Sequence, residues 1–90
     1  MDARLKILLL EDLPSDADLI KREIKNSGFD ILSLVVETKK EYIKALKEFN
    51  PDIILSDYSL PTFDGKQALL IRGELAPHIP FILVTGSNNE

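Results

Sequence analysis

The sequence contains no cysteine, no long hydrophobic run and no concentration of basic residues. Without cysteine the chain forms neither disulfides nor a thiolate metal site, a composition that fits a reducing compartment. Its first apolar run, residues 7–10, is too short for a signal-peptide core or a membrane span, so we expect a cytoplasmic protein with no membrane partner. Eleven basic and fifteen acidic residues give a net charge of -4, which argues against direct nucleic-acid binding.

The sequence does contain a short apolar run that ends in a carboxylate. Residues 53–56 follow Asn50-Pro51 and lead directly to Asp57, which a proline-bearing loop follows. An unbroken Ile/Leu run of this kind is typical of a strand buried on both faces of a parallel sheet. Asp57 is therefore predicted at the carboxyl end of a strand, the rim where ligands bind in open α/β sheets.

Three further apolar runs predict a four-stranded sheet. Strands are expected over residues 7–10, 29–36 and 81–85, with a helix between each strand and the next. Ninety residues make one domain at most. Strands alternating with helices predict an α/β fold with a doubly wound parallel sheet and right-handed crossovers. With the flavodoxin-like strand order 2-1-3-4, the first and third strands are neighbours.

Apolar residues at spacings of three and four predict the inner faces of three helices. Thr38 and Glu41 match a capping box at the start of the second helix. Gly28 suits the exit of the first helix, and Asn50-Pro51 ends the second. The predicted inner residues are Leu13, Ala17, Ile20 and Ile24 in the first helix, Tyr42, Ile43, Leu46 and Phe49 in the second, and Ala68, Leu69, Ile71 and Leu75 in the third.

The predicted strand order brings three carboxyl groups together, because Glu11 and Asp12 follow the first strand as Asp57 follows the third. Two such charges about 4 to 5 Å apart repel by roughly 3 to 4 kcal/mol at an effective dielectric constant of about 20. The cluster can bind a proton, or it can bind a hard cation, for which Mg²⁺ fits best. A carboxylate beside such a metal can also attack phosphorus. Taken singly, an aspartate such as Asp57 after an apolar strand is more often a turn or cap residue than a nucleophile, and Glu11-Asp12 suits the first turn of a helix.

These residues resemble the receiver domain of bacterial two-component response regulators, and the resemblance covers essentially the whole chain. It rests on the acidic pair Glu11-Asp12 and on the spacing of three other segments. The first of these is Asp57, and the second is the loop after it, which contains Pro61 and Gly65. The third is Val84-Thr85-Gly86, after the fourth strand.

The resemblance implies a phosphoacceptor signalling module rather than an enzyme. Asp57 would receive a phosphoryl group from the phosphohistidine of a sensor histidine kinase or a phosphotransfer protein. Mg²⁺ would be bound by Glu11, Asp12, Asp57 and the backbone carbonyl of Ser59. Thr85 would be the switch residue, whose hydroxyl hydrogen-bonds the phosphoryl oxygen and so displaces the following loop and helix.

The family also has a fifth strand, with a lysine that pairs with the phosphoryl group, and a fifth helix. Residues 1–90 are therefore expected to form a partial receiver domain. None of the eight lysines is expected in that position, so phosphorylation of the 90-residue chain is expected to be slow or absent. The fourth strand is expected to be a sheet edge with uncovered apolar side chains, through which copies self-associate or swap elements.

Two other functions remain open from the sequence. Without the lysine, the chain would be a pseudo-receiver, an interaction module with the same fold and no phosphorylation. A metal-dependent phosphohydrolase of the haloacid-dehalogenase type needs a second aspartate two residues after the nucleophile, where this sequence has Ser59. A nucleotide carrier is disfavoured because Glu11-Asp12 would repel phosphates.

Overall fold

The computed structural model describes residues 4–11, 14–57 and 65–84, with the backbone alone at positions 14, 16, 57, 65 and 84. Strands and helices alternate along these residues, as the sequence predicts. The elements are β1 (Leu5–Leu10), α1 (Pro14–Asn26), β2 (Ile31–Val36), α2 (Lys39–Glu48), β3 (Ile53–Asp57), α3 (Gly65–Leu75) and β4 (Phe81–Val84).

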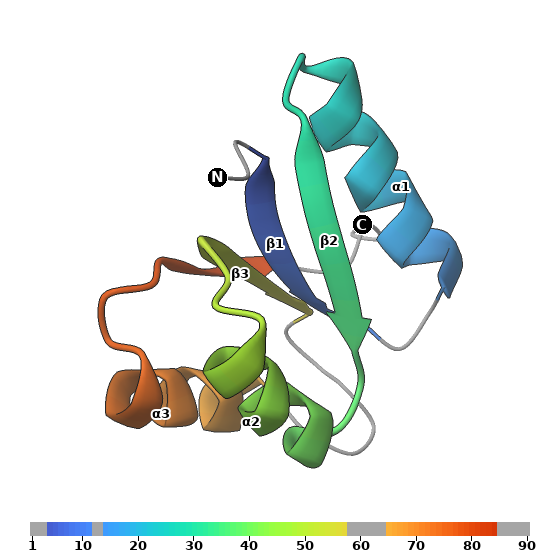
Figure 1. The fold of residues 1–90 in the computed structure, drawn as a ribbon. Coiled ribbons are helices and arrows are strands. Elements are labelled where there is room, and N and C mark those ends of the chain that lie inside the picture. Colours follow the sequence, from blue (N-terminus) through green and yellow to red (C-terminus); the bar gives the residue numbers. More distant parts are fainter. Residues whose placement is uncertain (1–3, 12–13, 58–64, 85–90) are drawn as a thin grey trace.

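The four strands form a parallel sheet in the order β2-β1-β3-β4, so the predicted order is confirmed (Figure 1). β1 pairs on both sides, with β2 from Leu5↔Ile31 onward and with β3 from Ile7↔Ile53 onward. Residues 7–10 are each at most 1% exposed. This burial explains the unbroken apolar run, because a strand covered on both faces has no solvent side for polar residues.

The helices cover the two faces of the sheet unequally. α1 packs along β2 on one face, whereas α2 and α3 lie together on the other (Figure 1). The main hydrophobic core lies between the sheet and the α2–α3 pair. Of the predicted inner residues of α2, Tyr42 and Leu46 belong to it and Phe49 packs against it, whereas Ile43 is only partly buried and is not among its members. Its buried members are Leu8, Leu10, Val36, Tyr42, Ala45, Leu46, Ile54, Ala68, Ala76 and Ile79.

Tyr42 ties α2 to α3 inside this core. Its side chain is fully buried, and its hydroxyl donates a hydrogen bond to the backbone carbonyl of Ala68, with 2.8 Å between the two oxygens. Burial raises the pKa of the Tyr42 phenol well above its ordinary value, so the hydroxyl remains a donor at every physiological pH.

The predicted capping box begins α2. The Thr38 hydroxyl accepts a hydrogen bond from the Glu41 amide at 3.2 Å, and the Glu41 carboxylate accepts one from the Thr38 amide at 3.3 Å. A second amide, that of Glu37, donates to the same carboxylate oxygen at 3.0 Å. These backbone donors favour the charged carboxylate and lower the pKa of Glu41.

β2 is shorter than the predicted strand 29–36. It begins at Ile31, and Phe29 is 57% exposed. Gly28, which follows α1, has a φ of 97°. The Leu5 amide donates a hydrogen bond to the Asp30 carbonyl at 2.9 Å, so the contact with β1 begins immediately before Ile31. The strand starts where it reaches β1, so pairing with β1 rather than the apolar pattern sets its first residue.

The inner face of α3 is narrower than predicted. Ala68 is fully buried and Ile71 packs against the core, but Leu69 and Leu75 are 42% and 44% exposed, so their assignment as inner residues was wrong. Leu69 lies about 100° around the helix from Ala68, and Leu75 is the last residue of α3. The prediction for Leu13 falls outside the described residues.

We expect Tyr42→Phe to lower the free energy of unfolding by roughly 1–2 kcal/mol, because the ring stays packed while the Ala68 carbonyl loses a buried donor. Urea denaturation followed by circular dichroism measures the change. Tyr42→Ala should lower the free energy by a further 2 kcal/mol or more, roughly, since it also leaves a cavity. A Tyr42→Phe protein as stable as the original would show that the hydrogen bond contributes nothing.

Candidate functional site

The carboxyl ends of β1, β2 and β3 meet at one edge of the sheet. Leu10, the last residue of β1, pairs with Val36 on one side and with Ser56 on the other. The next residues along β1 and β3 are Glu11 and Asp57. The parallel register therefore puts these two acidic residues at adjacent positions, as the sequence predicts for the neighbouring first and third strands.

Glu11 is held at this edge by the backbone. Its amide donates to the carbonyl of Val36 at 3.1 Å, which continues the β1–β2 pairing one residue past the last residue of β1. Its side chain is only 6% exposed. Burying a carboxylate to this extent costs stability unless hydrogen bonds or a cation offset its lost hydration.

Asp57 ends β3 and also pairs with β4, through Asp57↔Val84. Its backbone therefore lies between β1 and β4, with Glu11 following one neighbour and Thr85 following the other along the chain. The predicted roles of Asp12, Ser59 and Thr85, and of the Asp57 carboxylate, concern atoms outside the described residues and stay predictions.

The donors at this edge suit a hard cation. Glu11 offers carboxylate oxygens, and Asp57 adds an aspartate one strand away. Oxygen ligands of this kind are the ones Mg²⁺ prefers. Within the described ranges, which omit Asp12 and the Asp57 carboxylate, no cluster of three metal-ligating side chains occurs.

All eight lysines lie within the described residues. Seven are in helices, and Lys6 lies near the amino end of β1. The Lys6 ammonium donates to the carbonyl of Phe49 at 3.1 Å and lies 5.6 Å from the centre of its ring. The Lys6 backbone is fixed as well, because its amide donates to the Asp52 carboxylate at 2.9 Å. Lys6 is therefore bound at the end of the sheet opposite Glu11.

Two cavities among the described residues do not include Glu11 in their lining. One, of about 380 Å³, lies between β2 and α2 and is lined mainly by apolar side chains. The other, of about 540 Å³, lies between β2 and α1 and is lined mainly by charged ones. The sequence analysis predicted neither cavity. The only signal for the second is the spacing of Lys21 and Lys25, four residues apart on a helix.

The family model of the response regulator receiver domain matches residues 7–90. Chemotaxis protein CheY from Listeria monocytogenes is 34% identical over 65 residues, which cover 72% of this chain and 54% of the relative. The DNA-binding transcriptional regulator NtrC from Proteus hauseri is 30% identical over 83 residues, covering 92% of this chain and 17% of that protein. The chain thus spans about half the length of its CheY relative, and far less of NtrC.

Solved structures show the same fold. The receiver domain of sensor histidine kinase PA1611 from Pseudomonas aeruginosa, which has a magnesium ion coordinated in its active site cleft, superposes with a TM-score of 0.77 at 28% identity. That match covers 94% of this chain and 70% of the other. The signal receiver domain of a putative LuxO repressor protein from Vibrio parahaemolyticus gives the same TM-score and identity, covering 96% and 65%.

We expect Asp57→Asn to raise the free energy of unfolding in the presence of EDTA by about 1–3 kcal/mol, because the predicted carboxylate cluster would lose a negative charge next to the buried Glu11. The matched control is Asp52→Asn at the opposite end of β3. It should lower stability slightly, since an asparagine oxygen still accepts the Lys6 amide but without the charge that strengthens this hydrogen bond. Urea denaturation of both variants measures the two effects. A fall in stability for Asp57→Asn equal to that of the control would argue against a carboxylate cluster.

Proposed function

The chain belongs to the response regulator receiver domain family, and on this premise we propose that Asp57 is the phosphoacceptor of a signalling relay. The observation that carries the proposal is the parallel register, in which Asp57 follows Ser56, the partner of Leu10, while Glu11 follows Leu10 itself. A carboxylate oxygen of Asp57 attacks the phosphorus of a phosphohistidine. The new O–P bond forms as the N–P bond to the imidazole breaks, and the imidazole takes up a proton.

Four groups would hold Mg²⁺ for this reaction: the side chains of Glu11, Asp12 and Asp57 and the backbone carbonyl of Ser59. When bound, the ion offsets the charge that develops on the phosphoryl oxygens. The low exposure of Glu11 supports its part in the proposal, because a buried carboxylate beside a second acidic residue gains most from a cation.

Thr85 would provide the readout. It follows Val84, whose backbone pairs with Asp57 in the register of β3 and β4. A hydroxyl at that position would donate to the new phosphoryl group, and its movement would be passed to the segment that follows.

The proposed partner is a histidine kinase or a phosphotransfer protein, and the chain would act as a signalling module without an enzymatic activity of its own. None of the helices in the described ranges has the length and hydrophobicity that crossing a membrane requires. We place this function in the cytoplasm, where the kinase domains that would phosphorylate Asp57 find ATP.

The phosphoacceptor proposal predicts that incubation with acetyl phosphate and Mg²⁺ adds one phosphoryl group to the chain, detected by intact mass. Asp57→Asn should abolish the addition. Asp52→Asn, at the other end of the same strand, should retain it. EDTA should also prevent it, because the metal would no longer offset the phosphoryl charge.

Modification that persists in Asp57→Asn would refute the assignment of the acceptor. An unmodified chain that is folded by circular dichroism would favour the pseudo-receiver instead, an interaction module without phosphorylation. The phosphohydrolase alternative requires turnover of a stable substrate, so release of phosphate from a phosphate monoester, lost in Asp57→Asn, would favour it over the phosphoacceptor. Release from acetyl phosphate would not separate the two, because an acyl phosphate formed on Asp57 also hydrolyses in water.

We also propose that the 90-residue chain self-associates through β4. β4 pairs only with β3 among the described strands. Its residues Ile82 and Leu83 are 47% and 40% exposed and point to opposite faces, because side chains alternate along a strand. A second copy of β4 would pair with the backbone N–H and C=O groups at this edge, and its own side chains would lie beside Ile82 on one face and Leu83 on the other.

This proposal predicts a molar mass that rises with concentration in size-exclusion chromatography with light scattering. Ile82→Lys should shift the equilibrium toward monomer. The matched control is Leu19→Lys, a substitution on α1 at a residue that is 48% exposed, and it should leave the equilibrium unchanged. A strictly monomeric, cooperatively melting original chain would contradict the proposal.

A further inference from the structure

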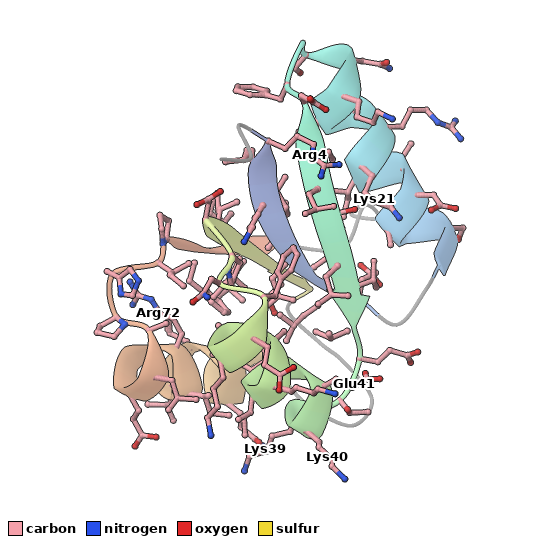
Figure 2. All side chains as sticks on the ribbon, viewed as in Figure 1. Arg4, Lys21, Lys39, Lys40, Glu41 and Arg72 are labelled. Carbon is pink, nitrogen blue, oxygen red and sulfur yellow. The ribbon has the colours of Figure 1, made fainter. Side chains whose placement is uncertain are left out.

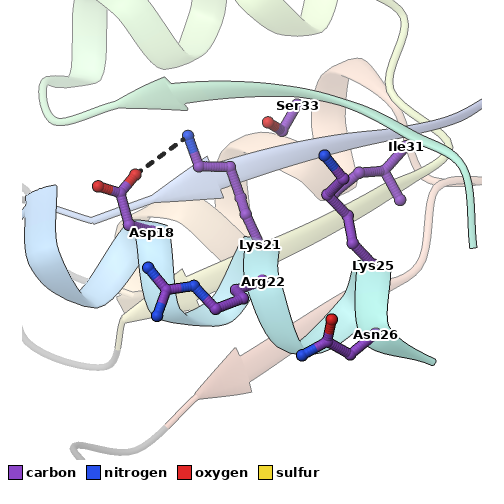
Figure 3. A pocket seen from close by; sticks show the side chains of 7 residues that line it. All are labelled: Asp18, Lys21, Arg22, Lys25, Asn26, Ile31 and Ser33. Carbon is purple, nitrogen blue, oxygen red and sulfur yellow. Dashed lines mark ion pairs between the residues drawn. The ribbon is translucent and has the colours of Figure 1, made fainter.

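A cavity of about 540 Å³ lies between α1 and β2, on the opposite face of the sheet from α2 and α3 (Figures 1 and 3). One wall comes from consecutive turns of α1 and the other from the amino half of β2. Charged and polar groups make up most of the lining, so the cavity is suited to a polar ligand rather than an apolar one.

The charge of the lining is opposite to that of the chain. The lining contains three cationic side chains, those of Lys21, Arg22 and Lys25, and one carboxylate, that of Asp18. The lining therefore carries three positive charges and one negative charge, in a chain whose net charge is -4. A local excess of positive charge in an acidic protein concentrates anions at that point of the surface.

The single carboxylate neutralises only part of this charge. It lies 3.5 Å from the Lys21 ammonium, and this exposed pair contributes little to stability. Within the described residues, Arg22 and Lys25 form no ion pair or side-chain hydrogen bond. Lys25 lies in the last turn of α1, where a cation also interacts favourably with the helix dipole. That interaction does not account for Lys21, which lies one turn earlier.

The two lysine ammonium groups point the same way. Lys21 and Lys25 are four residues apart, and both side chains extend from α1 toward β2 (Figure 3). Arg22 extends along the helix toward Asp18 instead (Figure 3). Figure 2 shows the place of Lys21 on α1 in the whole molecule. Like charges at this spacing repel each other in the free protein, and an anion held between the two ammonium groups would remove that repulsion.

The opposite wall adds a hydroxyl. Ser33 is the one polar residue in β2, whose sequence is Ile-Leu-Ser-Leu-Val-Val, and it lies on the side of the strand that faces the lysines (Figure 3). Serine is poorly suited to an apolar strand. At this position, however, its hydroxyl can donate to a ligand in the cavity, with Ile31 beside it as the apolar part of the wall.

We propose that this cavity binds a phosphoryl dianion, held by the ammonium groups of Lys21 and Lys25 and by the Ser33 hydroxyl. Two cations and a hydroxyl match the two charges and several acceptor oxygens of a phosphate ester, and charge-assisted hydrogen bonds are the strongest available to such a group. A small soluble phosphate ester and a lipid headgroup share this chemistry.

The cavity is distinct from the phosphoacceptor edge. Ile31 pairs with Leu5 at the amino end of β1, whereas Glu11 follows Leu10 at the carboxyl end. Ser33, which would hold the ligand, pairs with Ile7, and Glu11 lies four residues after Ile7, which corresponds to roughly 13 Å. The acidic edge would repel a free phosphate in the absence of metal, so binding measured in EDTA reports on the α1–β2 cavity and not on Asp57.

The test is calorimetric titration of the 90-residue chain with inorganic pyrophosphate in EDTA. The double variant Lys21→Gln/Lys25→Gln should weaken binding roughly tenfold or more. The matched control is Lys40→Gln/Lys44→Gln, which removes two exposed lysines at the same spacing on α2 and makes the same change in net charge. It should alter affinity by roughly twofold at most. Ser33→Ala should give an intermediate loss.

Parallel sedimentation with vesicles of phosphatidic acid, whose headgroup is a phosphomonoester, and phosphatidylcholine identifies the source of the phosphoryl group. Binding of pyrophosphate alone indicates a soluble ligand, and vesicle binding that is lost in the Lys21/Lys25 variant indicates a headgroup. The proposal is overturned if neither probe binds saturably, or if the α2 control weakens binding as much as the α1 variant does. Either result is independent of whether Asp57 accepts phosphate.

Discussion

The parallel pairing of β1 between β2 and β3 is the constraint on which the rest of the structure depends. It buries residues 7–10 on both faces, and it brings the carboxyl ends of three strands to one edge of the sheet. Because strand directions are parallel, whatever follows each strand collects at that edge. The adjacent positions of Glu11 and Asp57 are a consequence of this register, although the two residues are 46 positions apart in the sequence.

The two faces of the sheet have different characters. Tyr42, Ala68 and the core around them join α2, α3 and the sheet through buried apolar contacts and one buried hydrogen bond. On the other face α1 leaves a cavity against β2, lined by charged side chains. The chain thereby keeps an acidic edge and a basic cavity at separate places on one small sheet, so that a metal ion and an anion would not compete for the same groups.

Strand β4 and helix α3 leave apolar side chains exposed to solvent. Ile82 and Leu83 on β4 and Leu69 and Leu75 on α3 are each about half exposed, although all are apolar. Apolar surface of this kind is stabilised when another surface covers it. At the amino end of the sheet, by contrast, Lys6 and Asp52 are joined by backbone and side-chain hydrogen bonds, which fix the pairing of β1 with β3.

The sequence by itself determined the order and type of the elements, the capping box at Thr38, the strand order and the adjacent positions of Glu11 and Asp57 at one edge. These depend on apolar runs, on side chains a few residues apart and on the general behaviour of parallel sheets. Only the tertiary structure decided that β2 begins at Ile31, that Leu69 and Leu75 lie outside the core, and that Lys21 and Lys25 face Ser33 across a cavity. The strand start, the exposure of the two leucines and the cavity each depend on how closely another element approaches. Local sequence patterns do not determine that distance.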